Sequence, residues 1–80
     1  MKAAERTTLT GLSLGTRGIV QSLEAEGLTR RRLLDLGLVP GTVVESLRRS
    51  PAGDPTAFRI RGAVIALRSE EGCMIKVRPI

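Results

Sequence analysis

Short stretches of alternating apolar and polar residues recur along the chain, and Gly and Pro separate them at short intervals. Alternation with a period of two is typical of half-buried strands, and frequent Gly and Pro indicate tight turns. We therefore predict five or six short strands, over 8–14, 17–23, 42–49, 56–61, 63–68 and 74–78. In the strand over 56–61 we expect Phe58 and Ile60 to point inward and Arg59 and Arg61 to point outward.

The stretch 27–38 departs from this alternation and has the spacing of a helix. Its leucines supply an apolar side, while Arg30 and Arg31 are expected to face solvent. Thr29 is a candidate N-cap, because its hydroxyl can accept a hydrogen bond from a free N–H of the first turn. Gly37 stands where a helix often ends on a residue with positive φ. A single further helical turn is expected over 69–73.

Together these elements predict a mainly β fold, a small barrel of about five or six short strands with one short α-helix. Closure into a barrel hides strand edges that would otherwise pair with other chains. The 80 residues are enough for one domain. We assign residues 7–80 to this domain and expect residues 1–6 to form a flexible tail.

The charge of the chain is lopsided, with 13 Lys and Arg against 8 Asp and Glu and a net charge of +5. A basic surface attracts acidic partners, which include nucleic acid, anionic lipid and acidic protein faces. Most of the cations are Arg, which favours bidentate recognition of carboxylate or phosphate groups. The charge therefore predicts an acidic partner and leaves its class open.

The residues that most enzymes and metal sites use are scarce. The chain has no His, Trp or Tyr, its only aromatic residue is Phe58, and its only cysteine is Cys73. A lone Cys without His offers too few soft ligands for a structural zinc site, and we expect Cys73 to be partly buried. The sequence also lacks the phosphate-binding loop pattern GxxxxGK[ST]. We predict no enzymatic activity, no cofactor and no metal site in the monomer.

Apolar runs such as 63–67 are far shorter than the roughly 20 residues that span a bilayer. The stretch 1–8 is polar and charged, unlike the apolar centre of a signal peptide. A single cysteine also cannot form an internal disulfide, which small secreted domains usually have. We therefore expect a cytoplasmic protein that does not insert into membranes.

The stretch 31–41 reads RRLLDLGLVPG, which is similar to the pattern RRL..LGL.PG of FeoA-type domains. Segments with the same order and spacing flank it, namely LGTRGIV (14–20), PAGDP (51–55), RGAVIALR (61–68) and IKV (75–77). Each segment alone is weak evidence for the family, but the whole set in this order and spacing is specific for it. The chain thus resembles the FeoA family over 9–77.

The resemblance implies an SH3-like barrel that acts beside FeoB, the membrane GTPase-permease of bacterial ferrous iron uptake. The expected role is non-enzymatic binding to the cytoplasmic region of FeoB, which would recruit the protein to the inner face of the membrane. Related domains also occur in iron-dependent repressors, so a nucleic-acid-binding or repressor-related module is the alternative. Small barrels bind single strands by aromatic stacking, so with Phe58 alone we expect no nucleic-acid partner. The sequence leaves open whether the protein also forms a weak homodimer.

Exposed arginines and one leucine around the helix and the strand over 56–61 are the candidate partner-binding residues. They are Arg30, Arg31, Arg32, Leu38, Arg59 and Arg61. Two positions depart from the family pattern. Gly72 stands where a small helix former such as Ala is expected, and Ser46 stands in a strand position that is more often apolar.

Overall fold

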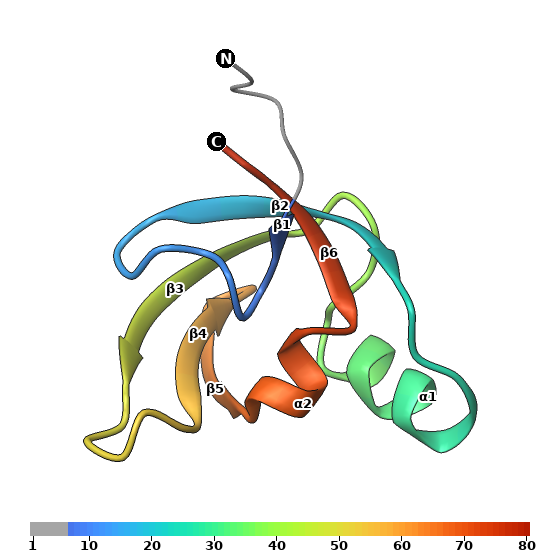
Figure 1. Cartoon of the computed structure of the whole chain (residues 1–80). Helices are drawn as coiled ribbons and strands as arrows, with labels where there is room; N and C mark the ends of the chain where they lie inside the picture. Colours follow the sequence, from blue (N-terminus) through green and yellow to red (C-terminus); the bar gives the residue numbers. More distant parts are fainter. Residues whose placement is uncertain (1–6) are drawn as a thin grey trace.

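The computed structural model describes residues 7–80, so the predicted tail over 1–6 lies outside the described residues. Within residues 7–80, six strands form one sheet in the order β1-β6-β2-β3-β4-β5, and two helices lie at its lower side (Figure 1). The elements are β1 (Thr7–Thr8), β2 (Arg17–Leu23), α1 (Gly27–Asp35), β3 (Val43–Arg49), β4 (Thr56–Ile60), β5 (Ala63–Leu67), α2 (Ser69–Gly72) and β6 (Ile75–Pro79). The prediction of a mainly β fold is confirmed.

Strands β2 to β5 follow one another as antiparallel neighbours, and β6 returns to pair with the other side of β2. The register shifts between Val20 and Ser22 on β2, and again between Ser46 and Arg48 on β3. Such bulges bend a strand and increase its twist. The strands therefore curve around a common interior, as Figure 1 shows.

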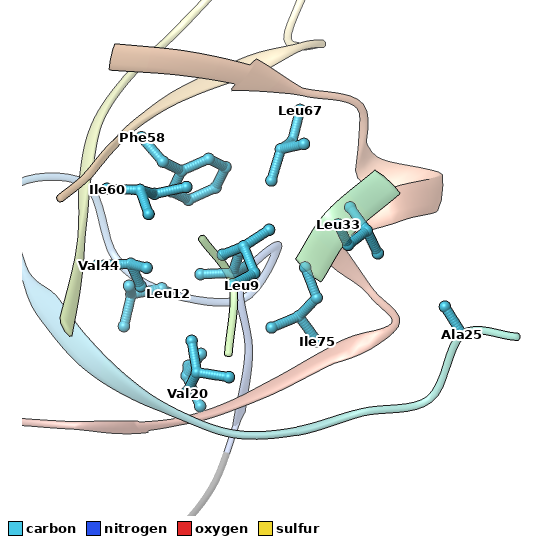
Figure 2. Close-up of a cluster of buried hydrophobic side chains, with 12 residues drawn as sticks. Leu9, Leu12, Val20, Ala25, Leu33, Val44, Phe58, Ile60, Leu67 and Ile75 are labelled. Atoms are coloured by element: carbon cyan, nitrogen blue, oxygen red, sulfur yellow. The ribbon is translucent and has the colours of Figure 1, made fainter. Parts of the chain in front are cut away.

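Alternate residues of the long strands point into this interior and form a single hydrophobic core (Figure 2). Phe58 and Ile60 are both buried there, as the alternation on β4 predicts. Burying one such side chain contributes about 1.5–3 kcal/mol relative to leaving it exposed. The buried members of the core are Leu9, Leu12, Val20, Ala25, Leu33, Leu38, Val44, Phe58, Ile60, Leu67, Ile75 and Val77.

The first predicted strand, over 8–14, is mostly wrong. Only Thr7–Thr8 pairs with β6, and the chain then turns because the N–H of Gly11 donates to the carbonyl of Thr8. This turn places Leu9 and Leu12 in the core (Figure 2), whereas Leu14 is 46% exposed. The spacing of three between the buried leucines reflects a turn rather than a strand.

The start of the helix also differs from the prediction. Helix α1 begins at Gly27, its N-cap is Glu26, and no side chain of residues 7–80 caps it. Thr29 lies inside the first turn, so its predicted role as N-cap is wrong. The chain turns early because Gly27 has a φ of +63°, immediately after the buried Ala25. At the other end, Gly37 has the predicted positive φ, +103°.

Candidate protein-docking surface

Helix α1 lies at the margin of the barrel, and only one of its residues is buried (Figure 1). Leu33 points into the core and fixes the helix to the barrel. On the opposite side, Leu28 is 84% exposed. Leu28 and Arg31 are three residues apart, so they are neighbours on one helix face. An apolar side chain beside a cation on an exposed helix is the kind of pair that protein interfaces bury.

The three arginines of α1 differ in their partners. Arg30 donates from Nη1 to the carbonyl of Leu23 at 3.4 Å, and Arg32 forms an ion pair with Glu71 of α2. Arg31 makes no side-chain hydrogen bond or ion pair with any residue in the range 7–80. The guanidinium of Arg31 is therefore the most available of the three for a partner.

The ion pair between Arg32 and Glu71 positions α1 relative to α2. The Glu71 side chain is only 18% exposed, and its Oε1 also accepts a hydrogen bond from the backbone N–H of Arg68 at 3.2 Å. One carboxylate thus closes the first turn of α2 and holds Arg32. The Arg32 side chain is still 53% exposed, so solvent and a partner can reach it although it pairs with Glu71.

Arg59 and Arg61 do not lie on α1. Arg59 is on the outer face of β4, and its Nη1 donates to Glu45 Oε1 of β3 at 3.3 Å. Arg61 was predicted in the strand, but it occupies the turn between β4 and β5 with a φ of +51°. Its Cδ lies 3.0 Å from the position that a Cβ on Gly37 would take, so this side chain covers the chain segment after α1.

Leu38 requires a correction. It is fully buried beside the other core residues, and its N–H donates to the carbonyl of Leu33 at 3.1 Å. A side chain in the core presents no surface to a partner, so the prediction that Leu38 contacts a partner is wrong. Leu28, which the sequence reading missed, is the exposed leucine of this segment. Its place on the helix face opposite Leu33 was the signal that could have identified it.

The other residues considered for a functional site offer few reactive or ligand-binding groups. Cys73 is exposed rather than partly buried as predicted, because it follows the last residue of α2 at the surface. Over residues 7–80, no three His, Cys, Asp or Glu side chains gather as metal ligands would. Neither helix in this range is long and apolar enough to cross a membrane. Phe58 is buried and cannot stack on a nucleotide base.

Comparison with known proteins identifies the family to which the chain is similar. The FeoA domain family matches residues 7–79. Over 72 residues the chain is 31% identical to an Fe(2+) transport protein A/Fe(2+) transporter FeoB fusion protein of Porphyromonas gingivalis. That match covers 90% of this chain and only 8% of the fusion protein. The chain therefore corresponds to a small part of that relative.

Solved structures agree in fold. The FeoA protein of Chlorobium tepidum superposes with a TM-score of 0.86 at 39% identity, covering 92% of this chain and 70% of that chain. The FeoA of Stenotrophomonas maltophilia, complexed with zinc and described as an SH3 domain protein, gives a TM-score of 0.79 at 32% identity. Here the coverage is 89% of this chain and 88% of that chain.

A manganese-dependent transcriptional repressor also superposes, with a TM-score of 0.84 over 96% of this chain and 43% of that chain. Its identity is 19%, so this likeness concerns the fold alone. The family match, in contrast, runs from the first described strand to the end of β6. This chain belongs to the FeoA family and has its SH3-like β-barrel fold.

Proposed function

We propose that this protein is a non-enzymatic accessory protein of bacterial ferrous iron uptake that binds the cytoplasmic region of the transporter FeoB. The observation that carries the proposal is the relative in which a transport protein A and the transporter FeoB form one fusion protein. A short flexible tether keeps two linked modules at an effective concentration in the millimolar range. An accessory protein that is not tethered to FeoB needs a docking surface to stay as close to the transporter as a fused module does.

The α1 surface, which we define as Leu28, Arg30, Arg31 and Arg32, is the proposed docking surface. Leu28 supplies exposed apolar area that a partner can bury, and Arg31 supplies a guanidinium with no partner among the described residues. Burial of the leucine stabilises the complex, while the cations accelerate the encounter with an acidic face of the transporter. Binding would modulate uptake by favouring one conformation of the GTPase or pore.

The proposal places the protein in the cytoplasm, where FeoB recruits it to the inner face of the membrane. It requires no catalytic group in this chain. A nucleic-acid-binding, repressor-related module is the alternative from the same fold, and it lacks a supporting observation because Phe58 is enclosed by the core. A weak homodimer is compatible with either function.

The test is a binding titration of the purified protein against full-length FeoB in nanodiscs, under reducing conditions and with or without guanine nucleotide. We expect saturable one-to-one binding in at least one nucleotide state. Absence of binding in every state would overturn the proposal. Titration with duplex and single-stranded DNA at physiological salt checks the alternative, for which we expect no specific complex.

A further inference from the structure

Strand β5 is the last strand of the sheet, and among residues 7–80 only β4 pairs with it. The expectation that closure into a barrel hides the strand edges is therefore wrong for β5. The two strands are joined by the two-residue turn Arg61-Gly62, and both residues have positive φ, +51° and +85°. These are the signs of a type I′ hairpin, in which the flanking residues Ile60 and Ala63 form a hydrogen-bonded pair. The register of β4 and β5 is therefore fixed from the turn onward.

Hydrogen-bonded and non-hydrogen-bonded pairs alternate along an antiparallel ladder. Counting from Ile60 and Ala63, the next hydrogen-bonded residues on β5 are Ile65 and Leu67. The backbone N–H and C=O groups of Val64 and Ala66 therefore point away from β4. No residue in the described range pairs with them.

In the described part of the chain, this edge lacks the features that usually prevent strand pairing. Natural edge strands are protected by charged residues, Pro, bulges or a covering element. Strand β5 consists of Ala, Val, Ile, Ala and Leu, its register with β4 is unbroken, and Val64 is 61% exposed. The free edge of β5 can accept another extended segment.

A hollow beside this edge gives room for a side chain of such a segment. Ala57 and Ala66 are opposite each other in the register of β4 and β5, and both line a shallow cavity of about 470 Å³. Their small side chains leave this space open. The rest of the lining is Arg48, Arg49, Ser50, Pro51 and Pro55.

The charged residues around the edge of β5 indicate which charge the bound segment carries at its ends. Arg61 precedes β5, Arg68 follows it, and Arg59 is opposite Val64 in the register. The only anionic partner of these three guanidinium groups in the described range is Glu45, which pairs with Arg59. The edge therefore has an apolar centre and an arginine at each end, and the acidic group near the Arg68 end is Asp54, whose Oδ1 accepts from the N–H of Ser69 at 2.8 Å.

A second copy of this chain fits the edge poorly. Antiparallel pairing of two β5 strands centred on Ile65 would place Arg61 of one copy opposite Ser69 of the other, one position from Arg68, at both ends. This pairing would gather two arginines at each end of the strand pair, and their like charges repel each other. An extended segment with acidic residues at its ends would instead pair with both arginines.

We propose that the free edge of β5 binds an extended segment of a partner protein, apolar or small at its centre and acidic at its ends, by strand addition. Backbone groups of Val64 and Ala66 provide the hydrogen bonds, and the hollow over Ala57 and Ala66 accepts one side chain. This site is separate from the α1 surface and does not depend on the identity of FeoB as partner.

The test uses backbone amide hydrogen exchange of the full chain by NMR. In the free protein, the N–H groups of Val64 and Ala66 should exchange quickly, while those of Ile65 and Leu67 are protected. The probe is the blocked peptide acetyl-ETVTVTE-amide, and the matched control is acetyl-KTVTVTK-amide. We expect the acidic peptide at saturation to slow exchange at Val64 and Ala66 at least tenfold, and the basic peptide to leave it unchanged.

Two variants identify the mechanism. Val64→Pro removes an outward N–H without removing a ladder bond, so the strand should persist while peptide protection at Ala66 is lost. Val64→Thr keeps the N–H and should behave like the parent protein. If Val64→Pro does not fold, the double variant Arg61→Glu/Arg68→Glu tests the same edge, because it should then prefer the basic peptide.

Three results would overturn the proposal. Saturating acidic peptide could leave Val64 and Ala66 unprotected, or the two peptides could protect them equally. Protection could also rise with protein concentration in the absence of peptide, which would make a second copy the occupant. Failure to bind FeoB would not affect these measurements, so the two proposals are tested separately.

Discussion

Gly72 packs directly against Thr10, and a Cβ on this glycine would lie 2.7 Å from Thr10 Oγ1. The same hydroxyl donates a hydrogen bond to the carbonyl of Ser69 at 3.1 Å, so Thr10 contacts both ends of α2. Gly72 is buried at this contact. The departure from the expected small helix former is thus explained, because even the methyl group of Ala does not fit against Thr10.

Gly72→Ala should lower the free energy of unfolding by about 1–2 kcal/mol. Overpacking typically costs about 1–3 kcal/mol, and the better helix propensity of Ala offsets up to about 1 kcal/mol of this. Urea unfolding measures the change. In the double variant Gly72→Ala/Thr10→Ala the clash is relieved, so its loss should be smaller than the sum of the two single losses. Simple additivity would contradict the contact.

Gly37→Ala should be more destabilising than Gly41→Ala, although both glycines have positive φ, +103° and +95°. Both variants incur the strain of a left-handed conformation, on the order of 1 kcal/mol. At Gly37 a Cβ would also lie 3.0 Å from Arg61 Cδ and 3.2 Å from Ile60 Cγ2, whereas at Gly41 it would meet no described atom within 4 Å. We expect an additional loss of about 1 kcal/mol for Gly37→Ala by chemical denaturation. Equal losses would disprove the packing role of Gly37.

Ser46→Ala should stabilise the protein. The side chain of Ser46 is fully buried, and its hydroxyl has no hydrogen-bond partner among residues 7–80. A buried unsatisfied hydroxyl costs about 1–3 kcal/mol, so its removal should raise the urea midpoint without changing the m-value. The matched control, Ser13→Ala, removes a hydroxyl from an exposed residue and should change stability by less than about 0.5 kcal/mol. Destabilisation by Ser46→Ala would show that the hydroxyl is satisfied.

Arg31→Glu should weaken binding to FeoB at least tenfold, which corresponds to about 1.4 kcal/mol. It should also reduce the salt dependence of the association rate, because a cation that steers the encounter is reversed. Arg17→Glu makes the same charge change on β2, away from α1, and serves as the control. If both variants weaken binding equally, net charge rather than the α1 surface determines affinity.

Most of the strands were predictable, because one face of each strand is buried and turn residues separate them. Alternation on β4 correctly placed Phe58 and Ile60 inside, and Gly37 marked the end of the helical segment. The segment after β1 was not predictable in this way. There Leu9 and Leu12 enter the core through a turn closed by Gly11, and a two-residue period does not describe them.

The candidate surface was harder to predict, because it depends on contacts between distant parts of the chain. Arg32 and Glu71 are 39 positions apart, and nothing local indicates that they pair. Leu38 looked like a surface residue beside Gly37, but its neighbours in space are core residues. The acidic partner that the composition predicts stays a prediction, and both proposed surfaces depend on arginines.

The two-residue strand β1 is an antiparallel neighbour of the last strand, with Thr7 opposite Val77 and Thr8 opposite Lys76. The polypeptide thus enters and leaves the described barrel at the same place. A protein built this way can be inserted into a surface loop of a host without pushing the ends of that loop apart. Genetic insertion of residues 7–80 into such a loop should therefore preserve both host and guest.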